Sequence, residues 1–173
     1  MAPHSGKGGL PIAVIDNTLL TRLVLLEIAD FLPWLFKQVR IPPEVKREAY
    51  KAPHKGKRRL RKLIAEQAGF FIDCHEADEG VKEILKADLG DGEAAAIAQA
   101  DYMKSVLLTD DKKAIKRAET MQLTVIRTLN VLDKLKDTEV ITEVKPYYEK
   151  LRRSGFYFSE DVRRKLLAEV GEE

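Results

Sequence analysis

The sequence has little cysteine, no long uninterrupted apolar run and no strong excess of charge of either sign. Its one cysteine, Cys74, cannot form an internal disulfide or a cysteine-rich zinc finger, which excludes both kinds of small scaffold. The most apolar stretch, residues 10–36, is interrupted by four charged residues, whereas a membrane span needs roughly 20 apolar residues in a row. A net charge of +2 identifies no anionic partner by itself. These absences fit a cytoplasmic protein with no membrane segment.

The length and composition predict a single domain with added elements. A chain of 173 residues with 45% hydrophobic and 34% charged residues can bury a core and is not disordered throughout. Residues 1–9 are short and Gly-rich, and we expect a flexible tail there. We expect an α/β domain over residues 10–136 and a helical C-terminal extension over residues 137–173, packed on the same domain.

Short apolar runs alternate with helical patterns along the chain. The runs predict strands at residues 11–15, 39–41, 70–72, 106–109 and 123–126. A first helix is expected, capped by Asn17 or Thr18. Further helices are expected at residues 44–50, 55–67, 79–86, 93–104, 112–121, 128–136, 144–154 and 159–170. Such an order of strands and helices favours a three-layer α/β/α fold with a central, mostly parallel sheet.

Acidic residues recur where predicted strands end or helices begin. Asp16 follows the first strand, and Asp110 and Asp111 follow the strand at 106–109. Glu48 lies on the helix after the second strand, and Glu93 begins a helix after a glycine turn. The carboxyl ends of parallel strands share one edge of a sheet, so these acids can meet there.

Such a cluster needs a proton or a cation, because two like charges about 4 Å apart repel by about 4 kcal/mol at an effective dielectric of 20. Mg²⁺ or Mn²⁺ prefers oxygen ligands and bridges to phosphate oxygens, which points to phosphodiester chemistry. Each acid alone has a plainer explanation: the aspartates can cap helices, Glu48 can be solvated, and Glu93 can favour the helix dipole. Their recurrence in successive units favours the shared site.

Four segments in this order resemble the motifs of PIN domains. They are the first strand and acid in Ile12-Ala13-Val14-Ile15-Asp16-Asn17-Thr18, the P-x-x-V-x-x-E element in Ile41-Pro42-Pro43-Glu44-Val45-Lys46-Arg47-Glu48, the G-x-G-E-x-x-A-I segment in Leu89-Gly90-Asp91-Gly92-Glu93-Ala94-Ala95-Ala96-Ile97-Ala98, and the T-x-D element in Leu107-Leu108-Thr109-Asp110-Asp111. Segments between residues 144 and 160 are similar to the helical tail of one PIN-like subfamily. The resemblance covers residues 11–171.

The resemblance implies a Mg²⁺- or Mn²⁺-dependent endoribonuclease, often the VapC-type toxin of a toxin–antitoxin pair, with an antitoxin protein as partner and a homodimer as the assembly. In the family's mechanism, carboxylates hold the metal, the metal lowers the pKa of a water, and hydroxide attacks the phosphate. Carried onto this sequence, the metal ligands are Asp16, Glu93, Asp110 and Asp111. The catalytic residues are Asp16, Glu48, Glu93 and Asp111, and Thr109 positions a ligand. The third acid, usually Asp, is Glu here.

A basic segment supports an RNA substrate. Residues 51–62 contain seven Lys or Arg residues and no acid, a local excess that can neutralise phosphates. The alternative is a solvated helix face or a surface for an acidic protein. The RNA-binding candidates are Lys55, Lys57, Arg58, Arg59, Arg61 and Lys62.

Other functions have weaker support. The principal alternative is a catalytically inert PIN-like module that binds RNA or protein, and a phosphate-accepting receiver is third. Gly90-x-Gly92-x-x-Ala95 satisfies a loose dinucleotide fingerprint, but it follows a predicted helix instead of a strand. Cys74-His75-Glu76 has no second cysteine or paired histidine at metal-ligand spacing.

Overall fold

The computed structural model describes residues 9–51, 56–157 and 159–172. They cluster into two compact units, of which the first ends at Thr128 and the second begins at Leu129. The boundary between the two units therefore lies at residues 128 and 129. The sequence predicts that the α/β domain ends later, at residue 136. Residues 1–8 of the expected tail lie outside the described residues. The packing of residues 137–173 on the α/β domain stays a prediction.

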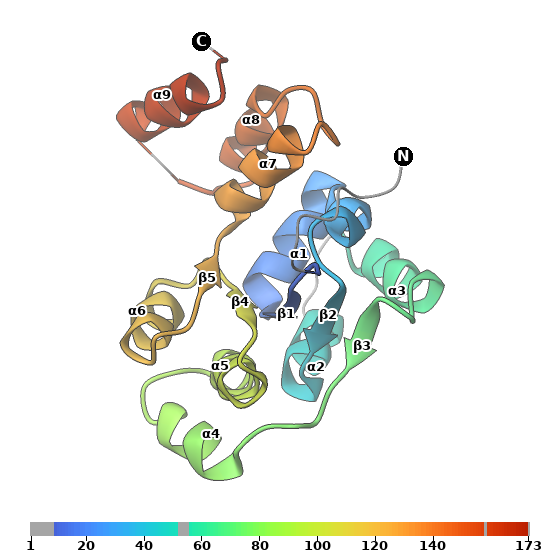
Figure 1. The fold of residues 1–173 in the computed structure, drawn as a ribbon, viewed down its shortest axis with the longest axis vertical. Coiled ribbons are helices and arrows are strands. Elements are labelled where there is room, and N and C mark those ends of the chain that lie inside the picture. Colours follow the sequence, from blue (N-terminus) through green and yellow to red (C-terminus); the bar gives the residue numbers. More distant parts are fainter. Residues whose placement is uncertain (1–8, 52–55, 158, 173) are drawn as a thin grey trace. The chain divides into compact units, whose positions relative to one another are not determined.

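The first unit is built on a five-stranded sheet with the strand order β3-β2-β1-β4-β5 (Figure 1). The strands are β1 (Ile12–Ile15), β2 (Gln38–Ile41), β3 (Phe71–Asp73), β4 (Val106–Leu108) and β5 (Val125–Ile126). Each neighbouring pair is parallel, with Val14 opposite both Arg40 and Leu107. The central strand β1 is buried on both faces, as its apolar sequence predicts.

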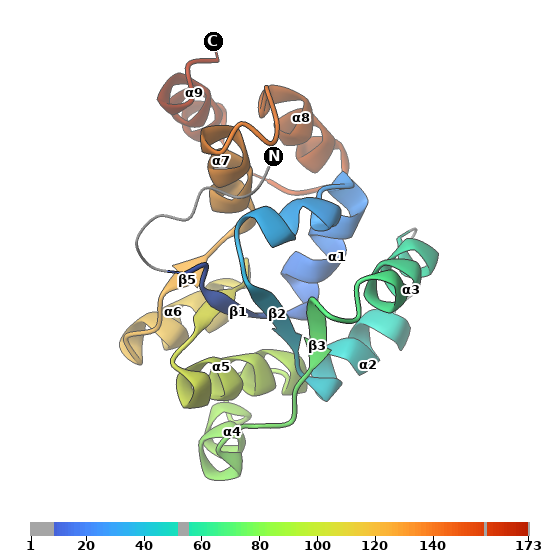
Figure 2. The same cartoon turned by 45° about the vertical axis from the view of Figure 1, so that its right-hand side comes forward.

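Helices follow the strands and flank the sheet. They are α1 (Asn17–Leu26), α2 (Pro43–Lys51), α3 (Lys57–Glu66), α4 (Glu79–Leu85), α5 (Asp91–Met103) and α6 (Lys112–Thr120). The alanine-rich helix α5 contacts β1 and β4, and α4 packs against α5 on its outer side (Figure 2). Small side chains let α5 lie close to the strands, and Ala94, Ala96 and Ile97 are fully buried. The predicted three-layer α/β/α fold is confirmed.

A short 3₁₀ helix, η1 (Ala29–Trp34), connects α1 to β2. Pro33 lies inside η1. A 3₁₀ turn of a few residues accepts proline more easily than the middle of an α-helix, where the ring removes a hydrogen bond.

The second unit consists of α7 (Thr128–Asp137), whose first residue belongs to the first unit, with α8 (Lys145–Arg153) and α9 (Glu160–Glu169). The Tyr148 hydroxyl is buried on α8 and donates to Asp133 on α7 at 2.8 Å. The Glu172 carboxylate accepts hydrogen bonds from the backbone N–H groups of Val144 and Lys145 at 2.8 and 2.9 Å. It therefore satisfies the exposed N–H groups at the start of α8.

No helix in the described ranges combines the length and the apolar character that a crossing of a bilayer requires.

Candidate active site

Asp16 connects the carboxyl ends of β1 and β4. It directly follows β1 and is only 1% exposed. One carboxylate oxygen accepts a hydrogen bond from the Leu19 N–H at 2.8 Å and so caps α1, a role that we predicted for Asn17 or Thr18. The other oxygen accepts a hydrogen bond from the hydroxyl of Thr109, the buried residue that follows β4. The carboxyl edge of the sheet is thus held together at Asp16.

The charge of Asp16 is poorly stabilised. Burial raises the pKa of its carboxyl group from 3.8 to about 7, although hydrogen bonds from Leu19 and Thr109 oppose the shift. The nearby carboxylates of Asp110 and Glu93 raise the pKa further. Acids from three separate segments therefore affect one another here, and a cation would relieve their repulsion.

Glu48 belongs to α2, and its side chain contacts the start of α5. Its Oε1 accepts a hydrogen bond from the Gly92 N–H at 3.0 Å. A Cβ atom at Gly92 would lie 2.5 Å from a Glu48 oxygen, so only glycine permits this approach. Burial raises the pKa of Glu48, Glu93 and Asp91 raise it further, and the Gly92 hydrogen bond opposes them. Glu93 thus influences both Glu48 and Asp16.

Glu93 itself folds back over the first turn of α5. A Cβ atom at Gly90 would lie 2.4 Å from its Oε2, so the carboxylate covers that glycine. Glycine at residue 90 therefore gives the Glu93 side chain space to adopt this conformation.

Asp110 is compensated by other protein groups. Its side chain is 2% exposed and forms an ion pair with Arg22 of α1. Its carboxylate also accepts hydrogen bonds from the Thr128 N–H, at 3.0 Å, and from the Thr128 hydroxyl. The Arg127 Nε lies 3.9 Å from one oxygen. These contacts tie α1 and the segment after β5 to the end of β4.

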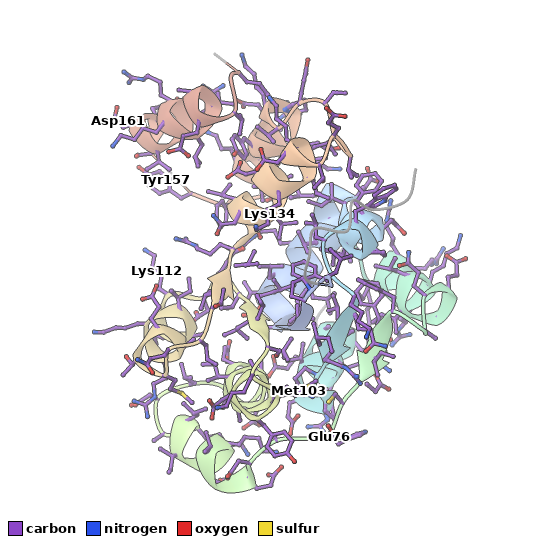
Figure 3. The ribbon with its side chains drawn as sticks, in the orientation of Figure 1. Glu76, Met103, Lys112, Lys134, Tyr157 and Asp161 are labelled. Carbon is purple, nitrogen blue, oxygen red and sulfur yellow. The ribbon has the colours of Figure 1, made fainter. Side chains whose placement is uncertain are left out.

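Asp111 resembles Asp16 in its local role. Its Oδ1 accepts a hydrogen bond from the Ala114 N–H at 2.8 Å and caps α6, while its own N–H donates to the Thr109 hydroxyl oxygen at 3.1 Å. Within the described ranges, no group donates to its second carboxylate oxygen. Lys112, the next residue, is exposed and extends outward (Figure 3). The Thr109 hydroxyl therefore bonds to both Asp16 and Asp111.

The side chains at this edge suit a hard cation in their chemistry. Carboxylates are the oxygen ligands that Mg²⁺ and Mn²⁺ prefer, and the buried side-chain amide oxygen of Asn17 (Oδ1) has no hydrogen-bond partner among the described residues. However, no three His, Cys, Asp or Glu side chains in that part of the chain are arranged to hold one ion. The predicted metal ligands stay predictions.

The basic segment lies mainly on α3, and several of its charges have partners. Arg59 pairs with Glu27 and Asp30 at 2.8 and 3.1 Å. Lys62 lies 3.7 Å from Glu66, and the Arg61 guanidinium lies 5.0 Å from the centre of the Tyr50 ring. The acids beside Arg59 follow the carboxyl end of α1, whereas Asp16 caps the opposite end.

Lys57 and Arg58 make no ion pair within the described ranges, and Lys55 lies outside them. Lys57 is half-buried and Arg58 is exposed. The predicted RNA-binding role of this segment stays a prediction.

Sequence reasoning missed three residues at the acidic edge, namely Arg22, Thr128 and Asn17. The sequence could have indicated a role for Arg22, because it is a charged residue within the largely apolar sequence of α1. Nothing in the sequence indicates the role of Thr128, since its contact with Asp110 depends on how distant strands pair, whereas Asn17 directly follows Asp16 in the first PIN-like segment.

Comparisons with known proteins agree with this architecture. A family model described as "DUF3368: PIN domain" matches residues 12–172. Among solved structures, the chain is similar to VapBC2 from Rickettsia felis bound to a DNA fragment from its promoter, with 15% identity, 67% of this chain and 98% of that chain covered, and a TM-score of 0.49. It is also similar to FitAcB from Neisseria gonorrhoeae, with 12% identity, 66% and 96% covered, and a TM-score of 0.45. No curated protein gives a significant match. Because the family model spans nearly the whole sequence, this chain belongs to the PIN-domain family DUF3368.

Proposed function

We propose that this PIN domain is a divalent-metal-dependent endoribonuclease that hydrolyses phosphodiester bonds in RNA. One observation carries the proposal: Asp16 is a buried carboxylate at the carboxyl edge of the sheet, and Asp110 and Glu93 raise its pKa. Repulsion of this kind is unfavourable without a cation and is common at sites that do chemistry. The family match supports a nuclease in general terms, because PIN domains are generally nucleases. It also supports a divalent metal, because PIN nucleases typically use one.

In this proposal, Asp16, Glu93 and Asp111 hold Mg²⁺ or Mn²⁺, with Asp110 in support. A bound ion of this kind would polarise the scissile phosphate and make a nearby water more acidic. Asp16 and Asp111 each use one oxygen to cap a helix, which fixes their orientation. The Thr109 hydroxyl, bonded to both residues, sets their spacing.

Glu48 is the proposed proton acceptor for the attacking water. Burial raises its pKa, which makes the carboxylate a stronger base. Its hydrogen bond to Gly92 fixes one oxygen and leaves the other to meet the water. Lys57 and Arg58 of α3, which make no ion pair among the described residues, supply positive charge for the substrate phosphates.

Cleavage of a pool of structured RNAs tests the proposal. The wild-type protein should cleave with Mn²⁺ and stop with a chelator, and Asp16→Asn should abolish cleavage. Asp101→Asn is a matched control, because Asp101 lies at the far end of α5 and pairs only with Lys104 in the described structure. Equal activity of the wild type and Asp16→Asn would refute the assignment.

An inert PIN-like module that binds RNA or protein is the second candidate. It is favoured by the lack of any three-residue metal group in the described part of the chain and by the ion pair of Asp110 with Arg22. Retention of RNA by the wild-type protein in Mn²⁺, with no cleavage of any RNA in the pool, would support this candidate.

The toxin role rests on the resemblance of the sequence alone. We propose that an antitoxin protein inhibits the chain and that the chain forms a homodimer. Expression that stops growth, with rescue by a neighbouring small reading frame, tests the first statement. The molar mass in solution tests the second.

A further inference from the structure

A cavity of about 130 Å³ lies at the carboxyl ends of β2 and β3, beside the acidic edge. Pro42, which follows β2, and Cys74, which follows β3, line it together with residues at the start of α2, on α4 and on α5. One water needs only about 10–15 Å³, so this cavity, hereafter the Gln99 cavity, can hold a larger ligand.

Gln99 of α5 lines the cavity and is 1% exposed. Neither its amide oxygen nor its amide nitrogen has a hydrogen-bond partner among the described residues. Burying an amide without partners costs free energy, and native proteins rarely leave both atoms in that state. The unpartnered amide therefore points to a ligand that offers a donor and an acceptor side by side.

The face of α5 that carries Gln99 is fixed by two other contacts. Met103 lies one turn further along the same face, and its sulfur is 3.9 Å from the Cys74 sulfur (Figure 3). Gly92, seven residues before Gln99, lies on that face and binds Glu48. Seven residues of helix span about 10 Å, or about three nucleotides at 3.4 Å each. One nucleic-acid strand can therefore reach both Glu48 and the cavity.

The remaining walls combine apolar and charged surface. Pro42, Pro43 and Ala95 provide apolar surface, and the exposed His75 can stack on a base from the rim. Glu44, Glu79 and Lys82 also line the cavity, and Lys82 pairs with both carboxylates at 3.2 and 2.7 Å.

A second cavity of about 290 Å³ shares Pro43 and His75 with the first. Lys46 and Asp73, which line it, pair with each other at 2.8 Å. Arg47 and Tyr50 also line it and add a positive charge and an aromatic ring beside the opening, which suits a phosphate and a neighbouring base.

We propose that the Gln99 cavity binds one nucleobase of a single-stranded nucleic acid, with the Gln99 amide paired to the base edge and His75 stacked on its face. Adenine is the best match, because glutamine forms a paired donor and acceptor contact with its N6 and N7 atoms. This inference rests on the proposed function in one respect, because the bound base is taken to belong to the RNA that is cleaved. The cavity would then select where the strand is cut.

Titration of ¹⁵N-labelled protein with each of the four nucleoside monophosphates tests the proposal. The Gln99 side-chain amide resonance is identified by its loss in Gln99→Met. Adenosine monophosphate should shift that resonance, and Gln99→Met should bind the nucleotide about fivefold to about 150-fold more weakly. Gln67→Met is the control, because Gln67 lies at the opposite edge of the sheet, where it binds Asp30, and its binding should equal that of the wild type.

Gln99→Met should melt at or above the wild-type temperature, because it removes an unpartnered polar group with little change in shape. If the variant does not fold, the Gln99 side-chain amide resonance is assigned instead on ¹³C,¹⁵N-labelled wild-type protein, and the titration of that protein decides. The proposal is wrong if no nucleotide shifts the Gln99 resonance. It is also wrong if only N-acetylglycinamide does, since the cavity would then bind peptide.

The outcomes also separate this inference from the nuclease proposal. If the wild-type protein binds adenosine monophosphate at Gln99 but cleaves no RNA, the nucleobase proposal stands and the nuclease proposal is wrong. The opposite result is cleavage of RNA with the same base preference in the wild type and in Gln99→Met, and no shift of the Gln99 resonance. In that case only the nucleobase proposal is wrong.

Discussion

The substitution Asp16→Asn should stabilise the metal-free protein at pH 8. Asparagine has nearly the volume of aspartate and caps helices equally well, so the hydrogen bond to Leu19 persists. The substitution removes a charge that is buried near Asp110 and Glu93. The variant should therefore be more stable but inactive, as expected where a strained group is kept for function.

The size of the effect follows from the pKa of Asp16. Because the folded-state pKa of about 7 lies above the unfolded value of 3.8, the favourable contribution is complete below pH 3.8 and is lost as the pH rises through 7. At about 1.36 kcal/mol per pH unit, the cost to the wild type at pH 8 has an upper limit of about 4 kcal/mol. Relaxation and water entry reduce it, so we expect asparagine to gain about 1–3 kcal/mol at pH 8 and little at pH 4.

A divalent cation should reverse the order of stability of the wild type and Asp16→Asn. If Mg²⁺ or Mn²⁺ binds at Asp16, a concentration of 100 times Kd stabilises the wild type by about 2.7 kcal/mol. The variant lacks the charge and should gain much less. The difference between the two proteins at pH 8 should therefore shrink or change sign when the metal is added.

Urea unfolding at pH 4 and pH 8, with and without Mn²⁺, measures both effects. The single tryptophan, Trp34, lies in η1 of the first unit, so its fluorescence reports on the unit that contains Asp16. Asp101→Asn retains Asp16 and should show the same pH dependence and the same metal dependence as the wild type. A gain for Asp16→Asn that is the same at both pH values would refute the reasoning about burial, and equal stabilisation of both proteins by metal would refute the ligand assignment.

Three further substitutions test other contacts. Gly92→Ala should displace Glu48, because the new methyl group would lie within 2.5 Å of a carboxylate oxygen; we expect little loss of stability in urea unfolding, because the end of a flexible side chain moves and alanine favours the helix, but slower RNA cleavage. Tyr148→Phe should destabilise the second unit by about 1 kcal/mol through loss of the hydrogen bond to Asp133, as measured by thermal unfolding followed by circular dichroism. Arg58→Gln should weaken RNA binding and reduce its salt dependence, and unchanged binding in a salt titration would count against a role for α3.

The order of strands and helices could be predicted because it depends on local sequence. The run Ile12–Ile15 is apolar on both faces, which is typical of a strand inside a parallel sheet. Each of the five strands lies within two residues of its predicted bounds. The helix cap at the end of β1 was assigned one or two residues too late, because Asp16, Asn17 and Thr18 are all good capping residues and only the course of the backbone selects among them.

The contacts of the candidate site could not be predicted in the same way. Arg22 and Asp110 are 88 residues apart in the sequence, and Arg59 and Glu27 are 32 apart. The segment around Arg59 contains no acid, so it appeared as uncompensated positive charge. Its partners come from the end of α1, which only the packing of α3 brings near. Local charge counts therefore overstate the free charge of a helix whose neighbours in the fold are acidic.

Asp16 and Asp110 are both buried at the carboxyl ends of the strands, but the protein balances the negative charge of only one of them. Asp110 has an arginine partner, a hydroxyl and a backbone N–H, so its charge is balanced by the protein. Among the described residues, Asp16 accepts hydrogen bonds from only one N–H and one hydroxyl, and two neighbouring acids oppose its charge. If both acids served only to hold the strands together, an asparagine at residue 16 would keep the cap without the electrostatic cost. The unbalanced carboxylate therefore supports the proposal that a cation binds there.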